Sequence, residues 1–245
     1  MDKPNNYFNR TYVINLPERT DRFREVTAAL ERIGMPLSPG KVEVFPALRP
    51  KEAAGFSSAG IRGCFLSHLA ILKQALDLEL SNVLIFEDDV EFASAFTRIW
   101  PSILTQLTSQ PWSFAYLGYN SCVDGSTYAS PDTATVEMRP LSGSLRCAHA
   151  YAVSRQAISP VIQHLEEMLQ RPPGHPEGGP MDVDGAFNVF RRKHPETLTL
   201  IAEPQVAWQR ASQSDLHSKW YAKRGMRILL WPARKVKNYF RQRRR

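Results

Sequence analysis

The sequence predicts an α/β fold in which helices flank a mostly parallel central sheet. Apolar segments alternate along the chain with segments of helical periodicity, which is the arrangement typical of α/β proteins. One apolar run, Val83–Phe86, has the uninterrupted hydrophobicity of a strand that is covered on both faces. Such strands belong to parallel sheets with helices on either side.

The expected elements follow one another as strand and helix. The apolar stretch Thr11–Leu16 predicts the first strand, and a helix should begin at Thr20 or Asp21, since either residue can cap it. We expect that helix to bury Phe23, Val26, Leu30 and Ile33. Further strands are expected at 42–45, 83–86, 112–119, 150–153 and 198–201, and further helices at 61–80, 156–169 and 182–192.

The composition is that of an ordinary globular protein. The 245 residues are 43% hydrophobic and 22% charged, and no apolar run reaches the roughly 20 residues of a membrane helix. The first residues lack the apolar core of a secretory signal. Three scattered cysteines, Cys64, Cys122 and Cys147, show no metal-ligand spacing and suit a reducing compartment. A cytoplasmic protein is therefore expected.

The net charge of +7 is concentrated at the C-terminus. Residues 219–245 carry eleven Lys or Arg and no acid, which leaves residues 1–218 at about −4. Apolar residues recur among these charges at helical spacing over 224–240, interrupted by Pro232. Such a tail can lie on an anionic membrane, although a solvated tail is the alternative. We therefore expect one domain over 1–218, with a basic amphipathic tail that holds it on the inner face of the cell membrane.

Three consecutive acids follow the apolar strand at 83–86. Glu87, Asp88 and Asp89 fall at its carboxyl end, where open α/β sheets bind ligands. Adjacent carboxylates repel one another unless a cation lies between them. Mn²⁺ or Mg²⁺, itself holding a phosphate, is the expected occupant, and a solvated acidic turn is the alternative.

Other polar residues are placed to join this site. Asn15 ends the first strand, and Arg19 and Arg22 surround a helix start, an arrangement that suits a nucleotide phosphate. Ser67 and His68 lie in the helix before the acidic strand, with His68 expected to be half-buried. Each of these residues could instead be purely structural.

The later part of the chain offers further candidates. His149 has small neighbours that suggest close approach of the backbone to a sugar. Asp182 and Asp184 follow the Pro/Gly-rich loop 171–180, so either could be a general base beneath a lid, or simply a helix cap. His217 could supply an additional metal ligand.

Several of these residues fall in motifs that occur together in one family. The early motifs are Thr-Tyr-Val-Ile-Asn-Leu at 11–16 with Arg19 and Arg22, Gly-Cys-Phe-Leu-Ser-His at 63–68, and Phe-Glu-Asp-Asp-Val at 86–90. The later motifs are Ala-His-Ala-Tyr at 148–151 with Ser154 and Arg155, Pro-Met-Asp at 180–182, Gln209, and Ser-Asp-Leu at 214–216. In this order and spacing they resemble glycosyltransferase family 25, which includes bacterial lipooligosaccharide galactosyltransferases and domains like those of collagen galactosyltransferases. The resemblance covers roughly residues 11–217.

The resemblance implies a GT-A-like fold, in which a Rossmann-type nucleotide-sugar half (about 1–120) merges with an acceptor half (about 121–218). Asp89 would bind the metal, joined by Glu87 and His217, while Asp88 or Glu87 reaches the ribose. Asp182 is the first choice for the base of an inverting reaction, and Asp184 the second. By the same resemblance Asn15, Arg19 and Arg22 would hold the nucleotide. The full set of residues that we expect to bind the donor is Asn15, Leu16, Arg19, Arg22, Ser67, His68, Asp88 and His149.

The function expected from the sequence is metal-dependent, inverting transfer of a hexose. The donor would be a UDP-sugar, with galactose as the sugar, and the acceptor a hydroxyl of a lipooligosaccharide, a lipid-linked glycan or a related cell-surface glycan. Three alternatives stay open: a collagen-type hydroxylysine galactosyltransferase, a metal-dependent nucleic-acid-binding protein, and a non-catalytic sugar-binding module. The negative charge of residues 1–218 argues against a nucleic-acid partner.

Overall fold

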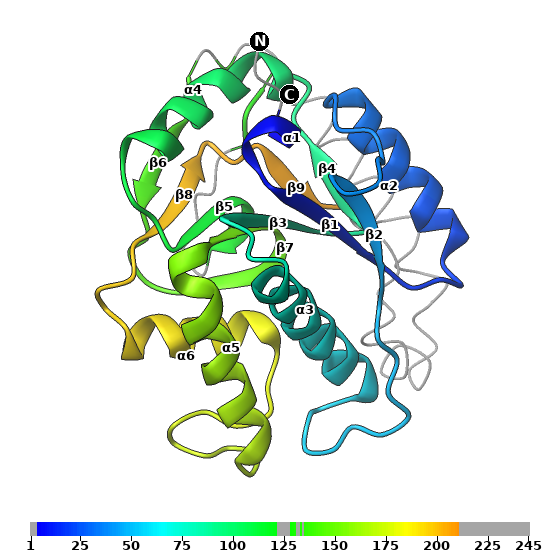
Figure 1. Cartoon of the computed structure of the whole chain (residues 1–245), viewed down its shortest axis with the longest axis vertical. Coiled ribbons are helices and arrows are strands. Elements are labelled where there is room, and N and C mark those ends of the chain that lie inside the picture. The colour runs from blue at the N-terminus through cyan, green and yellow to red at the C-terminus, as the bar shows by residue number, and fades with distance from the viewer. Residues whose placement is uncertain (1–3, 122–127, 131–132, 134, 211–245) are drawn as a thin grey trace, which may run out of the picture.

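The computed structural model describes residues 4–121, 128–130, 133 and 135–210 (Figure 1). Its helices are α1 (Pro4–Tyr7), α2 (Thr20–Arg32), α3 (Ala59–Asp77), α4 (Phe96–Ser109), α5 (Arg155–Gln170) and α6 (Val183–Lys193). The main sheet contains β1 (Arg10–Asn15), β2 (Val42–Pro46), β3 (Asn82–Glu87), β5 (Phe114–Ser121), β6 (Glu137–Pro140), β7 (Leu145–Ser154) and β8 (Thr199–Glu203). The short strands β4 (Val90–Phe92) and β9 (Ala207–Gln209) form a separate pair.

The seven-stranded sheet has the order β2-β1-β3-β7-β5-β8-β6. Strands β2, β1, β3, β5 and β8 run in one direction, because β7 is antiparallel to both of its neighbours. Only β7 and the edge strand β6 are reversed within this sheet. The prediction of a mostly parallel sheet flanked by helices is confirmed.

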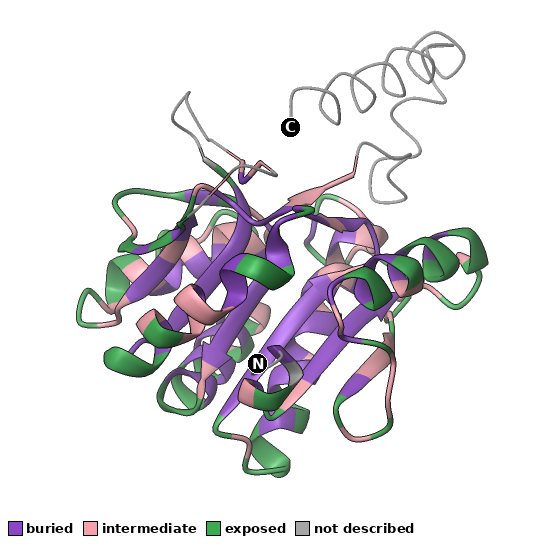
Figure 2. Cartoon of the chain, turned by 90° about the horizontal axis from the view of Figure 1, so that it is seen from above, coloured by how far each residue is buried: buried purple, intermediate pink, exposed green. Residues whose placement is uncertain are grey.

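Each face of the sheet is covered by its own hydrophobic core. Leu84 and Phe86 point into a core that α2 and α4 share, while Val83 and Ile85 point into one built with α3, α5 and α6. Figure 1 shows the two groups of helices on opposite sides of the sheet, and Figure 2 shows buried strands beneath helices with exposed outer faces. This two-sided burial explains why the 83–86 run is apolar at every position.

Helix α2 begins at Thr20 as predicted, but it differs from its prediction in its cap and in its buried face. Its N-cap position is Arg19, whose side chain makes no capping hydrogen bond, so neither Thr20 nor Asp21 caps the helix. Phe23, predicted to be buried, is 37% exposed, and the neighbouring Arg22 is buried instead. The helix is therefore turned so that a charged residue faces inward, towards the acids that follow β3.

The start of α3 presses closely on the segment after β2. A Cβ atom at Gly63 would lie 2.3 Å from the carbonyl oxygen of Leu48. One turn later, the Ser67 hydroxyl accepts a hydrogen bond from the Leu48 amide at 2.8 Å and donates one to the Gly63 carbonyl at 2.7 Å. Gly63 and Ser67 thus hold the segment that follows β2 against the helix.

We predict that Gly63→Ala destabilises the protein although alanine is the better helix former. The new methyl group would overlap a backbone oxygen, and overpacking of this kind costs about 1–3 kcal/mol of unfolding free energy. Gly185→Ala in α6 is the matched control, since its methyl group would meet only the flexible Met181 side chain, with the sulfur at 3.2 Å. Urea unfolding should show a loss for the first variant alone; equal stability of both would contradict the prediction.

Candidate active site

A cavity of about 340 Å³ opens at the carboxyl ends of β1, β2 and β3, beside the start of α3. Small-molecule sites in proteins begin at about this size. The structure brings together here several residues that the sequence assigned to the donor and the metal. Those that line the cavity are Leu16, Arg19, His68, Glu87 and Asp88.

Arg22 is the cation that lies among the three acids. Its guanidinium donates to Asp88 Oδ1 at 2.7 Å and is 3.7 Å from Asp89 Oδ2. All three side chains are about nine-tenths buried. Asn15 donates to the other oxygen of Asp88 at 2.8 Å. The repulsion that the sequence suggested is thus offset by a residue of the chain itself, and Asp88 is held on both of its oxygens.

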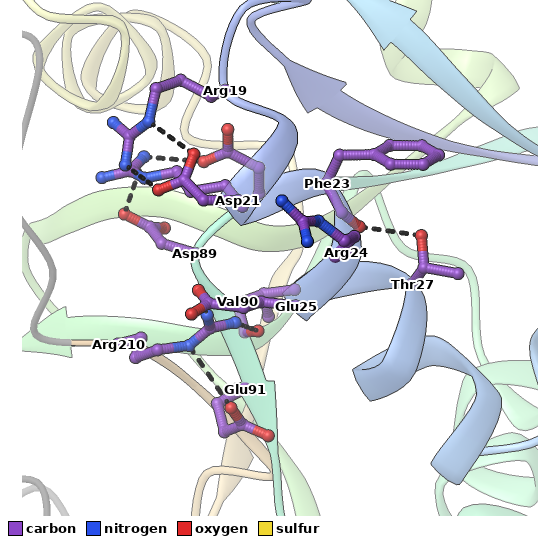
Figure 3. A network of polar contacts seen from close by, with 12 residues as sticks. Arg19, Asp21, Phe23, Arg24, Glu25, Thr27, Asp89, Val90, Glu91 and Arg210 are labelled. Carbon is purple, nitrogen blue, oxygen red and sulfur yellow. Dashed lines mark hydrogen bonds and ion pairs between the residues drawn. The ribbon is translucent and has the colours of Figure 1, made fainter.

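Asp89 also contacts the short pair β4–β9. Gln209 donates to its Oδ2 atom at 3.1 Å, and the Arg210 amide donates to its backbone carbonyl at 2.7 Å. Figure 3 shows Arg210 beside Glu91 and the Val90 carbonyl, next to this residue. The Oδ1 atom of Asp89 is buried and has no hydrogen-bond partner within the described part of the chain. Burial, followed by the charge of Glu87, raises the pKa of Asp89 to about 7.

Glu87 faces a different neighbour, His68. Its Oε1 atom lies 3.5 Å from His68 Nε2, and its side chain is about a fifth exposed. Burial opposes ionisation of Glu87, but the nearby His68 outweighs it and lowers the pKa. His68 was predicted to be half-buried and is fully buried, with Nδ1 2.8 Å from the Tyr151 hydroxyl. Glu87 therefore lies beside His68, whereas Asp88 and Asp89 share Arg22.

Two other residues assigned to the donor lie behind the cavity wall. Ser67 is fully buried and holds Leu48, which lines the cavity. His149 is also fully buried; the Cβ atom that Gly118 lacks would lie 2.6 Å from His149 Nε2. Burial lowers the pKa of His149 to about 4, so the ring is neutral at pH 7. The close backbone approach expected at His149 is therefore with strand β5.

The two candidate bases have different surroundings at the start of α6. Asp184 accepts a hydrogen bond on each oxygen, from the amides of Cys147 at 2.7 Å and of Gly185 at 2.8 Å. Cys147 has a positive φ of 66°, so Asp184 supports a backbone conformation that L-residues rarely adopt. Asp182, at the N-cap position, is exposed and makes no capping hydrogen bond. The pKa of the Cys64 thiol, which lines the cavity, is raised mainly by burial and by the charge of Glu87. Asp184 and Asp182 make smaller contributions in the same direction.

Other parts of the prediction lie outside the described residues. These are His217, the motif at 214–216 and the tail 219–245. Within the described residues, no helix is long and apolar enough to cross a bilayer.

Sequence reasoning missed Tyr151, the cavity segment 47–50 and the proximity of Cys64 to His68. Cys64 and His68 are four residues apart on α3, and this spacing places two side chains on one face of a helix. The prediction considered only the spacing among the three cysteines, and so it overlooked the spacing between Cys64 and His68. Nothing in the sequence marks the segment 47–50, which joins the site through tertiary contacts.

The chain matches known proteins in both sequence and fold. A family model described as "Glycosyltransferase family 25 (LPS biosynthesis protein)" matches residues 8–171. Procollagen galactosyltransferase 2 of Mus musculus is 25% identical over 206 residues, covering 77% of this chain and 31% of the relative. The human inactive glycosyltransferase 25 family member 3 is 28% identical over 129 residues, covering 45% of this chain and 22% of the relative.

One solved structure has the same fold. It is a glycosyltransferase involved in the glycosylation of the major capsid of PBCV-1, with a TM-score of 0.52 at 11% identity, covering 84% of this chain and 93% of that chain. The architecture is that of a GT-A-like glycosyltransferase, as predicted. The chain belongs to glycosyltransferase family 25. It spans about a third of the length of the procollagen galactosyltransferase that it matches.

We predict that Arg22→Met strongly destabilises the fold. Breaking a buried ion pair by removing one partner typically costs about 3–5 kcal/mol, because the remaining charge stays buried. Without the guanidinium, Asp88 and Asp89 would take up protons more readily when folded than when unfolded. The loss in unfolding free energy should therefore shrink as the pH falls from 7 towards 5.

Arg24→Met is the matched control in the same helix, because Arg24 is exposed and, within the described part of the chain, its side chain bonds only to the Thr20 carbonyl at 3.2 Å. Its effect should stay within about 0.5 kcal/mol. Equally small losses for both variants in urea unfolding would show that the buried pair does not stabilise the fold.

Proposed function

We propose that the chain is a metal-dependent, inverting hexosyltransferase. In this proposal it moves galactose from a UDP-sugar to a hydroxyl of a lipooligosaccharide or a related cell-surface glycan. The observation that carries the proposal is the cavity at the carboxyl ends of β1 and β3, which gathers Leu16, Arg19, Glu87 and Asp88. Membership of a family described by lipopolysaccharide biosynthesis supports the choice of acceptor.

The walls of the cavity suit a nucleoside diphosphate. Ala59 and Gly60, the first two residues of α3, line it, and the positive end of a helix favours anions. Arg19 adds a guanidinium that is one-fifth exposed. Leu16 and Leu48 supply apolar surface for a base or sugar ring. Asp88, held by Arg22 and Asn15, presents a fixed acceptor to a ribose hydroxyl.

The acids also suit a hard divalent cation. Asp89 Oδ1 is a buried oxygen without a hydrogen-bond partner among the described residues, and Glu87 reaches the cavity. Oxygen ligands are those that Mn²⁺ and Mg²⁺ prefer. We propose that Asp89 and Glu87 hold the ion, with His217 as the additional ligand expected from the sequence. When bound, the ion would offset the negative charge of the departing diphosphate.

We propose Asp182 as the general base. The Asp184 carboxylate is engaged on both oxygens by backbone amides, which makes it a support for Cys147. Asp182 is exposed and can meet an acceptor hydroxyl from solvent. The loop 171–180 packs on the segment before α3, since a Cβ at Gly55 would lie 3.1 Å from Pro173 and 3.2 Å from Pro180. We propose that this loop excludes water from the donor.

The second candidate function keeps the donor and changes the acceptor. The mouse relative is named a procollagen galactosyltransferase, which favours a protein hydroxyl such as that of hydroxylysine. Presenting collagen-type peptides and truncated lipooligosaccharide to the same preparation would separate the two acceptors. Family membership leaves the nucleic-acid-binding alternative without support.

We predict that Asp89→Asn abolishes metal-dependent transfer. Loss of a group that stabilises charge in a transition state typically lowers kcat by about 10²–10³-fold. The measurement is UDP release from a panel of UDP-sugars, with and without Mn²⁺. Glu91→Gln is the control, because Glu91 pairs with Arg210 and Arg32 and does not line the cavity. Near wild-type activity of a folded Asp89→Asn protein would refute the role, whereas no UDP release by the wild-type chain with any donor would fit a sugar-binding module.

We also propose that residues 1–218 form one domain and that the tail 219–245 docks it on the anionic inner face of the cell membrane. The eleven cations of that tail and its lack of acids support this assignment.

A chain ending at Ser218 should therefore lose binding to liposomes that contain anionic lipid. Each Lys or Arg near such a surface contributes about 1 kcal/mol, so the loss should be large at low salt. Sedimentation with liposomes is the measurement, and neutral liposomes are the control. Unchanged binding by the shortened chain would contradict the proposal.

A further inference from the structure

A second group of metal-ligand side chains lies at the floor of the cavity. Cys64 and His68 are one turn apart on α3, and Glu87 ends the facing strand β3. One ligand atom from each of the three lies within 4.8 Å of the others. Cys64 is a free thiol, and all three residues line the cavity. Asp88 and Asp89 do not belong to this group.

The spacing between His68 and Glu87 suits an ion better than a hydrogen bond. Nε2 and Oε1 are 3.5 Å apart, which exceeds the usual hydrogen-bond length of about 2.7–3.2 Å. A tetrahedral ion bound about 2.0–2.2 Å from each atom would hold them about 3.4 Å apart. The same ion would place the Cys64 sulfur about 3.6 Å from the imidazole nitrogen. The group therefore needs to contract by little more than 1 Å to reach coordination geometry.

His68 is oriented for coordination by its other ring nitrogen. Nδ1 lies 2.8 Å from the Tyr151 hydroxyl, and the two rings are adjacent at 5.7 Å between centroids. The imidazole is completely buried, yet Nε2 has no hydrogen-bond partner among the described residues and faces the cavity. An outer hydrogen bond that orients the ring is the usual support of a metal-bound histidine.

We propose that Cys64, His68 and Glu87 form a binding site for a borderline-soft divalent ion of the zinc class. Thiolate, imidazole and carboxylate are zinc ligands, whereas a thiolate is a poor ligand for Mn²⁺ or Mg²⁺. Three protein ligands leave the fourth position open to the cavity. This site is distinct from the hard-cation site that we propose around Asp89, although both would use Glu87. Zinc bound here would withdraw Glu87 from that other site.

The test uses Co²⁺ as a spectroscopic substitute for zinc in the full chain, reduced and freed of metal with a chelator. The chain has three cysteines, so the background variant C122S/C147S leaves Cys64 as its one thiol. Titration with Co²⁺ should give a thiolate-to-cobalt charge-transfer band that saturates at one equivalent. Zn²⁺ should abolish the band by displacement, and Mg²⁺ should not.

Variants separate this site from other thiols and from the acids around Asp89. Adding Cys64→Ser to the background should remove the band, and His68→Gln should weaken cobalt binding at least 10-fold. Asp89→Asn should leave the band unchanged. Circular dichroism of each variant checks that it is folded.

The folded C122S/C147S protein lacking the band would overturn the proposal, as would a band that persists without Cys64. No sugar donor enters the experiment, so its outcome is independent of whether the chain transfers a hexose.

Discussion

The buried pair between Arg22 and Asp88 is the interaction on which the site depends. It joins α2 to the end of β3, and the guanidinium also lies 3.7 Å from Asp89, so its charge offsets part of the repulsion between these two acids. Arg22, Asp88 and Asp89 are nearly buried, so an unpaired charge on any of them would destabilise the fold. The same pair explains why α2 buries an arginine where the apolar pattern predicts Phe23. Burial of this ion pair overrides the local apolar pattern.

The three acids differ in their hydrogen-bond partners, although Asp88 and Asp89 share the charge of Arg22. Asp88 is held by Asn15 and Arg22, Asp89 by Gln209, and Glu87 lies beside His68. Burial raises the pKa of Asp88 as well as that of Asp89, despite the neighbouring cation. Three adjacent residues of similar chemistry can therefore take different roles, since a strand end turns successive side chains in different directions.

The sequence predicts the strands and helices of this protein better than the side-chain contacts at the cavity. The uninterrupted apolar run at 83–86 correctly indicated a strand with both faces covered, and two of the acids after it, Glu87 and Asp88, line the cavity. Helix α4 was missed although its apolar residues recur at helical spacing, and it contains Pro101, which usually indicates a break. The neighbours of His149 could not be predicted, because they come from β5 and β9 through pairing that no local pattern specifies.

Helix α3 serves two tasks with consecutive residues. Gly63 and Ser67 contact Leu48 in the segment after β2. Cys64 and His68, each one position further along, line the cavity. The two residues of each pair are about one helical turn apart. Both pairs therefore depend on the same position of α3 relative to the sheet. Sliding the helix to widen the cavity would carry the imidazole and thiol away from Glu87 by the same step. The volume of the cavity and the distance of Cys64 and His68 from Glu87 are thereby coupled. A substitution that shifts α3 would change both together.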